Sequence, residues 1–311
     1  DGGGNVISNP TVTWATSAEG VATVSSANLV TAVADGTATI TATSGSVEAT
    51  AAATVAQAAA SIELSDTVLS FSSLGDTTQL TATVRDANNN VISGATVTWT
   101  TSSSSIATVS SAGLVTAIAD GTATITATSG SVNQTAAVTV SQVAASVTLA
   151  PTSLSFSSIG DTTTIVATVK DANNNVIPSP TVTWTTSSSS IATVSSAGLV
   201  TSVANGSATI TAASGSVSAT ATATVSQVAV SLTLAPTSLS FTSIGDTTTI
   251  VATVKDANNN TIPGATVTWA TSAEGVATVS SAGLVTAVAD GTATITATSG
   301  SASATATATV S

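Results

Sequence analysis

Apolar and polar residues alternate along most of this chain in short runs. In the run "GTATITATSG", residues 121–130, the apolar side chains Ala123, Ile125 and Ala127 alternate with threonines. A period of two places the apolar side chains on one face of a strand and the hydroxyls on the other. Antiparallel sheets with one buried face and one solvated face have this pattern. The alternation therefore predicts an all-β protein.

Turn signals separate the alternating runs at short intervals, as is typical of a β-sandwich. Within one stretch we expect eight strands, near residues 59–64, 67–71, 77–85, 95–101, 105–109, 114–118, 121–128 and 133–140. The alternation in "TTQLTATVR" places Leu80, Ala82 and Val84 on one face. In "TVTWTT" it places Val97 with Trp99. We predict that these five side chains belong to the core.

The same sequence recurs with a period of 85 residues, which is too long for a solenoid unit and fits a small sandwich domain. Four tryptophans and three glutamines share this period: Trp14, Trp99, Trp184 and Trp269, with Gln57, Gln142 and Gln227. We therefore predict a partial domain at residues 1–56, followed by complete domains at residues 57–141, 142–226 and 227–311.

The first unit matches only the last two thirds of a complete unit, and we expect its first two strands to be missing. Each complete unit has one phenylalanine that the first unit lacks, at Phe71, Phe156 and Phe241. A sandwich without these strands has open edges and an exposed core face. We expect the sequence to be a window onto a longer array; the alternative is that another protein supplies the missing strands.

Two positions vary between the repeats in a way that indicates turns. A glycine becomes Asn28 in the first unit, and Gly and Asn share a tolerance of positive φ, so we predict a hairpin turn there. That glycine is Gly113, Gly198 or Gly283. An aspartate before a glycine becomes Asn205 in the third unit, as a tight turn allows and a metal site does not. That aspartate is Asp35, Asp120 or Asp290.

One segment carries a family resemblance. The run "VTWTTSSSSIATVSSAGLVTAIADGTATITATSG", preceded in complete units by "SFSSLGDTTQLTATV", resembles the bacterial immunoglobulin-like group 2 family, and the match covers the chain four times over. The resemblance implies tandem immunoglobulin-like β-sandwiches in a linear array. It also implies spacer roles, as in intimin-like and invasin-like adhesins, surface-layer and cell-wall proteins and phage-tail decorations. It supplies no catalytic residues.

Composition excludes several classes of function. Charged residues make up 6% of the chain, against roughly 25% in typical soluble proteins. The net charge is −12 with three cations, so there is no basic patch for nucleic acid or anionic lipid. Without Cys or His there are no disulfides, no thiolate or imidazole metal sites, no Cys nucleophile and no His general base. No apolar run is long enough for membrane insertion.

An Asn-rich loop begins like a calcium loop, with Asp171, Asn173 and Asn175 in the order Asp-x-Asn-x-Asn. The same letters start at Asp86 and Asp256, and residues 1–5 form a degenerate copy, "DGGGN". An EF-hand needs Gly at the sixth position and Glu at the twelfth, and here both positions fail. We therefore predict an inter-strand turn and assign no metal ligands. Calcium between domains stays open, since three further aspartates could approach a neighbouring domain: Asp76, Asp161 and Asp246.

Other candidate sites are weaker. The threonine rows invite an ice-binding interpretation, but a solvent-facing strand accounts for them. Three Asn-x-Ser/Thr sequons could accept glycans, at Asn133, Asn205 and Asn259, and exposed Ser and Thr could carry O-glycans. Four carboxylates are candidates for hydrolysis, Glu19, Glu63, Asp66 and Glu274, and none has a partner base. We assign no catalytic or cofactor-binding residue and predict that the protein is not an enzyme.

The sequence favours a structural role outside the cell or at its surface. Tandem sandwiches with short linkers form a semi-rigid rod, and few cations leave few tryptic sites. Nearly uncharged sides can pack laterally without desolvating ions. We therefore predict a component of a surface filament, sheath or fibre that associates with its own copies. The alternatives are an adhesin stalk, a carbohydrate- or receptor-binding module, or a phage-tail decoration.

Overall fold

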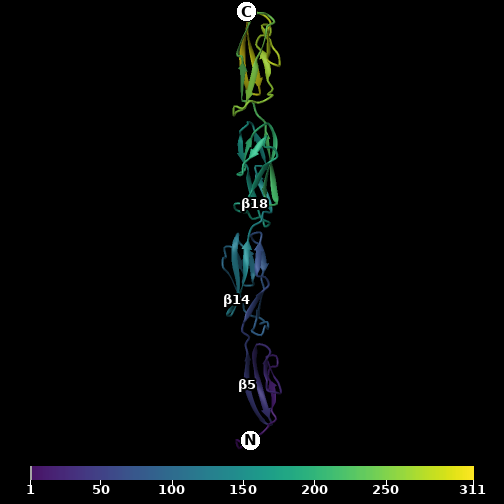
Figure 1. Ribbon diagram of the computed structural model, residues 1–311, viewed down its shortest axis with the longest axis vertical. Coiled ribbons are helices and arrows are strands. Elements are labelled where there is room, and N and C mark those ends of the chain that lie inside the picture. The colour runs from purple at the N-terminus through teal and green to yellow at the C-terminus, as the bar shows by residue number, and fades with distance from the viewer. Residues whose placement is uncertain (1) are drawn as a thin grey trace. The chain divides into compact units, whose positions relative to one another are not determined.

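The computed structural model describes residues 2–311, and every regular element in that part of the chain is a β-strand (Figure 1). The chain divides into two compact units, Asp1–Gln142 and Val143–Ser311. The first unit holds β1 to β14 and the second holds β15 to β32. The all-β prediction is therefore confirmed. Asp1, the first residue of the chain, lies outside the described residues.

The strands between Ser61 and Val140 form a two-layered sandwich. Its strands are β6 (Ser61–Leu64), β7 (Val68–Phe71), β8 (Thr77–Gln79), β9 (Ala82–Arg85), β10 (Thr98–Thr101), β11 (Ala107–Val109), β12 (Leu114–Ala117), β13 (Gly121–Ser129) and β14 (Val132–Val140). One layer is a four-stranded sheet in the order β10-β13-β14-β7, in which β7 runs parallel to β14. The other layer consists of the pair β6-β9 and the three-stranded sheet β11-β12-β8.

The second unit repeats this pattern twice. Residues 143–226 contain β15 (Ser146–Ala150), β16 (Ser153–Phe156), β17 (Thr162–Thr164), β18 (Val166–Lys170), β19 (Thr183–Thr186), β20 (Ala192–Val194), β21 (Leu199–Ser202), β22 (Gly206–Ser214) and β23 (Val217–Val225). The strands of residues 227–311 are β24 (Ser231–Ala235), β25 (Ser238–Phe241), β26 (Thr247–Thr249), β27 (Val251–Lys255), β28 (Thr268–Thr271), β29 (Ala277–Val279), β30 (Leu284–Ala287), β31 (Gly291–Ser299) and β32 (Ala302–Val310). Sheet order is the same in each copy, for example β25-β32-β31-β28.

The expected strand at residues 77–85 is in fact two strands, β8 and β9. The break falls at Leu80, whose amide donates to the carbonyl of Gly113 while its side chain is buried. On one side of the break β8 pairs with β12, and on the other side β9 pairs with β6. The chain therefore changes its pairing partner at Leu80, although the apolar alternation continues through it.

The core of each complete sandwich lies between its layers and is built mainly from alanine, valine, isoleucine and leucine, with one buried phenylalanine. In residues 57–141, Leu80 and Val84 are buried, while Ala82, Val97 and Trp99 are partly buried and pack against the core. All five predicted core positions therefore contribute to it. The outward side chains of β13 and β14 are mainly threonines, which matches the expected division into an apolar face and a hydroxyl face.

The first repeat contains only β1 (Thr13–Thr16), β2 (Ala22–Val24), β3 (Val30–Ala32), β4 (Gly36–Ser44) and β5 (Val47–Val55), which correspond to β10 to β14. Its main sheet has three strands in the order β1-β4-β5, and none of the described residues before β6 forms a counterpart of β7. Val30 is consequently 44% exposed, whereas the equivalent Val115 is 0% exposed.

The hairpin turn that has Gly113 in one repeat and Asn28 in another has the same backbone conformation in both. Gly113 has a φ of 83°, and Asn28 has a φ of 59°, so both adopt the predicted left-handed conformation. A Cβ at Gly113 would lie 2.5 Å from the backbone oxygen of Leu80 and 3.0 Å from Cζ2 of Trp99. None of the described residues of the first repeat corresponds to Leu80, and Asn28 is exposed in this structure.

Replacing Gly113 with Asn should destabilise the domain at residues 57–141 by about 1–3 kcal/mol, because the new Cβ overpacks against Leu80 and Trp99. Gly130→Asn is the matched control, since Gly130 has a φ of 59° and a Cβ added to it would meet nothing within 4 Å. We expect the control to change stability by less than about 0.5 kcal/mol. Domain-resolved hydrogen exchange during urea unfolding measures both, and equal losses of stability would contradict the steric explanation.

Candidate functional site

The Asn-rich loop is a turn closed by its own aspartate. In the last domain, Asp256 Oδ1 accepts the backbone N–H groups of Asn258 and Asn260 at 3.0 and 2.8 Å. Asn259 between them has a φ of 66°. The loops that start at Asp86 and Asp171 repeat this arrangement. An aspartate that bonds the backbone two residues on forms an Asx turn, and the loop lies between strands as the sequence predicted.

Within the second unit, the same aspartate also reaches the preceding domain. Asp256 Oδ2 accepts the backbone N–H of Ile159 at 2.9 Å, although the two residues are 97 positions apart. The side-chain amides of Asn258 and Asn260 donate in return to the carbonyl oxygen of Ile159, at 3.0 and 2.9 Å. Asn258 Nδ2 also donates to Asp161 Oδ1 at 2.9 Å, so Asp161 does approach the neighbouring domain, as the sequence suggested. The loop therefore joins two domains.

A glutamine at the linker completes this junction. The backbone N–H of Gln227 donates to Asn205 Oδ1 at 2.8 Å. The side-chain Nε2 of Gln227 donates to Asp256 Oδ2 at 2.9 Å. Where the repeats carry Asp in place of Asn205, the carboxylate accepts the same backbone amide, as Asp120 does from Gln142 at 2.8 Å. Asp and Asn are interchangeable here because a single side-chain oxygen is needed. Sequence reasoning identified the turn and missed this acceptor role.

The first unit has a reduced form of the junction. The side-chain Nε2 of Gln57 donates to Asp86 Oδ2 at 2.9 Å. The backbone N–H of Gln57 donates to Asp35 Oδ1. None of the described residues before Gln57 corresponds to the loop around Ile159. Asp86 is consequently half-buried, whereas Asp256 is 2% exposed.

These contacts set the ionisation of both carboxylates. Burial of Asp256 raises its pKa, but hydrogen bonds from Gln227, Ile159 and the two asparagine amides outweigh burial, and the pKa lies below the ordinary value for Asp. At Asp86 the hydrogen bond from Gln57 is the largest cause of a lowered pKa, followed by the Asn90 amide. Both groups are therefore anionic at neutral pH and serve as acceptors.

The junction does not have the composition of a metal centre. Residues 2–311 contain no group of three or more acidic side chains that could hold a metal ion. The two oxygens of Asp256 already accept from four groups of the loop, linker and neighbouring domain, namely Asn258, Asn260, Gln227 and Ile159. A cation would have to displace these donors.

The remaining candidates are dispersed over the surface. Glu63 Oε2 lies 3.6 Å from a guanidinium nitrogen of Arg85, and Glu19, Asp66 and Glu274 are exposed in loops. The sequon asparagines Asn133 and Asn259 are exposed, and the Asn205 side-chain amide donates to Gln227 Oε1 at 3.2 Å. These residues do not come together, and glycosylation stays a prediction.

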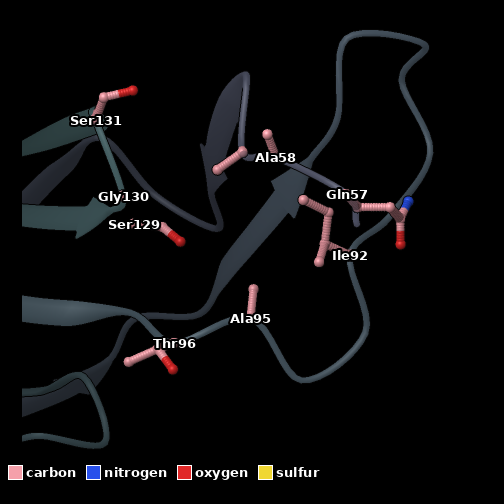
Figure 2. Close-up of a pocket in the computed structure, with 9 residues that line it drawn as sticks. Gln57, Ala58, Ile92, Ala95, Thr96, Ser129, Gly130 and Ser131 are labelled. Carbon is pink, nitrogen blue, oxygen red and sulfur yellow. The ribbon is translucent and has the colours of Figure 1, made fainter. Parts of the chain in front are cut away.

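An open hollow of about 450 Å³ lies beside the start of the second repeat (Figure 2). Three segments line it: the linker at Gln57 and Ala58, the loop from Ile92 to Thr96, and the hairpin turn at residues 129–131. Figure 2 shows the Gln57 amide on the far side from this hairpin turn. The lining consists of methyl groups, hydroxyls and one amide, with no titratable side chain, so the hollow offers no acid or base. The described residues also contain no helix that could span a membrane.

Comparison with known families identifies the repeat. The model described as bacterial Ig-like domain (group 2) matches residues 5–55, 58–140, 143–225 and 229–310. A search of curated protein sequences gives no match.

Several solved structures are similar to the chain. The surface-layer protein SbsC, domains 1–6, is 22% identical over 93% of this chain and 47% of its own, with a TM-score of 0.28. Invasin, a bacterial integrin-binding protein, is 16% identical over 90% of this chain and 66% of its own, at 0.38. FdeC, an Escherichia coli adhesin, is 20% identical over 83% of this chain and 99% of its own, at 0.35. The chain spans about half the length of the SbsC structure.

Acid should loosen the junction only below the ordinary pKa of aspartate, about 3.9. A lowered folded-state pKa means that the ionised Asp256 stabilises the fold at neutral pH, and that this contribution is lost as the pH falls through the lowered value. The amide resonance of Ile159 reports this ionisation in an NMR titration. We expect its midpoint to lie below the ordinary pKa of aspartate. A midpoint at or above that ordinary value would contradict the assignment.

Calcium should leave the melting temperature unchanged at about 10 mM, because the Asp256 oxygens are already occupied by N–H donors. Differential scanning calorimetry with sodium chloride at equal ionic strength is the control. A rise in melting temperature specific to calcium, and absent in Asp161→Asn, would show that the junction binds the ion.

Proposed function

Because the chain belongs to the bacterial Ig-like domain (group 2) family, we propose that it is a structural extracellular repeat protein, a semi-rigid rod within a surface filament, sheath or fibre. The observation that carries the proposal is the junction at Asp256. It fixes one domain to the next through groups that repeat along the chain. Polar contacts that hold neighbouring domains together suit a protein that transmits tension along a row of domains and keeps that row at a fixed length.

The junction supports stiffness for a physical reason. The Ile159 amide donates to Asp256 while its carbonyl accepts from Asn258 and Asn260, so one peptide segment is held from both sides. Hydrogen bonds to a charged acceptor stabilise by about 1.5–3 kcal/mol each, more than neutral ones. Bending at the linker would break several of them together. The linker is thus held by more than chain connectivity.

The composition supports a location outside the cell. Three cations in 311 residues leave few cleavage sites for trypsin-like proteases. With charged residues at 6%, the fold depends little on ionic strength. The absence of Cys makes the fold independent of the redox state of its surroundings. These properties suit a protein exposed to a variable medium.

A non-catalytic role agrees with the inventory of side chains. The chain has no Cys or His, and the carboxylates of the described residues either close turns or stand apart on the surface. The hollow in Figure 2 offers no acid, base or nucleophile beyond serine and threonine hydroxyls. We therefore include no reaction in the proposed function.

Small-angle scattering tests the rod. We expect an extended particle in which each complete domain adds about 30–40 Å, the length of its longest strands with their turns. Asp256→Ala should broaden the distribution of lengths, because it removes the acceptor for Ile159 and Gln227. Asp86→Ala is the matched control, since none of the described residues before Gln57 corresponds to Ile159, and it should change the distribution less.

A wild-type chain as flexible as the Asp256→Ala variant would contradict the rod. Antibodies to the chain test the location on intact cells of the source organism. Labelling without permeabilisation is expected, and labelling only after lysis would contradict the extracellular part of the proposal.

A further inference from the structure

The outer face of the four-stranded sheet carries no charged residue in any complete domain. We call this surface the threonine face; it is formed by the outward side chains of β7, β10, β13 and β14 and of their counterparts in the two later domains. In the last domain it presents Thr294, Thr296 and Thr298 on β31 and Thr305, Thr307 and Thr309 on β32. The first repeat differs, because β5 carries Glu48.

The charges of the chain lie elsewhere. All three cations end strands of the opposite layer: Arg85 on β9, Lys170 on β18 and Lys255 on β27. Most acidic groups of the complete domains lie in loops, and Glu63 lies on β6, also in the opposite layer. At a net charge of −12, two copies repel each other least when they meet at a face without charge, because their like charges then stay farther apart and are screened by salt. The threonine face meets that condition.

The chemistry of the face also selects its partner. A threonine hydroxyl is both a donor and an acceptor, so a threonine surface is complementary to itself. Burying a hydroxyl without a hydrogen bond costs about 1–3 kcal/mol, and the partner must therefore return hydrogen bonds. The register places hydroxyls opposite one another across strands, as in Thr294 with Thr307 and Thr296 with Thr305. Their methyl groups add apolar area between the rows.

We propose that the threonine face docks against the threonine face of a second copy of this chain. The inference rests on the proposed filament role, in which copies lie side by side. Two sheets that pack face to face lie about 10 Å apart, with side chains interdigitated. Threonines are short enough for that spacing, and the regular rows of β31 and β32 give a surface without large protrusions.

The area of the face sets the strength of the contact. The two nine-residue strands are about 30 Å long and the two four-residue strands about 13 Å, so at about 4.8 Å per strand one domain offers on the order of 400 Å². A stable protein interface buries about 800 Å² on each partner. One domain is insufficient and two are enough, so the contact is weak per domain and accumulates along the chain.

The test uses the full chain in sedimentation-equilibrium experiments over a range of concentrations. Wild type should show an average mass that rises with concentration. The variant Thr209→Glu with Thr294→Glu places a charge in the middle of two threonine faces, and should shift association to at least tenfold higher concentration. The matched control is Thr148→Glu with Thr233→Glu in the opposite layer, where the repeat already carries Glu63. The control should associate almost as wild type does, apart from the added net charge.

A second variant keeps the test decisive if the first is unstable. Ser218→Glu with Ser303→Glu copies the position of Glu48, which the first repeat tolerates on its sheet. Calorimetry checks that each variant folds. A monomeric wild type at all concentrations would overturn the proposal, as would equal loss of association in the face variant and its control. Loss of binding to a soluble polysaccharide, with self-association intact in the face variants, would also overturn it and assign the face to sugars.

The sedimentation test of the threonine-face contact and the scattering test of the rod can fail independently of each other. An extended and monomeric chain leaves the rod intact and removes the threonine-face contact. A flexible chain that associates through this face removes the rod and leaves the contact.

Discussion

The antiparallel pairing of two nine-residue strands is the interaction on which each domain depends. The pair β13 and β14 provides the inner face that closes the core, the outer face of threonines, and the bend at Asp120 that holds the next linker. The same pair survives as β4 and β5 in the first repeat, although the strands equivalent to β6 to β9 have no counterpart there among the described residues. The strands β7 and β10 pair with this hairpin, and the remaining strands of the domain form the opposite layer that packs against it.

The alternation of apolar and hydroxyl residues made most of this predictable. Strand positions, the core at Leu80 and Val84, and the left-handed turn at Gly113 follow from local periodicity and from exchanges between repeats. The break at Leu80 was not predictable, because the alternation is the same whether a strand stays in one layer or changes its partner. The junction was missed for a different reason: Asp256 meets Ile159 across 97 positions, and no local pattern reports such a contact.

Charge has an unusual use in this protein. Most globular domains distribute ions over their surface for solubility, whereas here aspartates are concentrated where backbone N–H groups need acceptors. Asp256 and Asp86 each close a loop and accept a hydrogen bond from a linker glutamine, and Asp256 also accepts one from the Ile159 amide of the preceding domain. The four-stranded sheet of each complete domain, by contrast, is built entirely from neutral side chains.

The parallel pairing of β7 with β14 has a mechanical consequence. These strands lie near the two ends of a domain sequence, and tension that reaches them pulls them along their length in opposite directions. Parallel strands loaded in this way are sheared, so their backbone bonds resist together, whereas a hairpin pulled from its open end unzips one bond at a time. The bonds from Ala137 to Thr67 and from Ser141 to Phe71 mark the two ends of this clamp. The first repeat, whose described residues have no partner of this kind beside β5, would yield at a lower force than the domains that follow it.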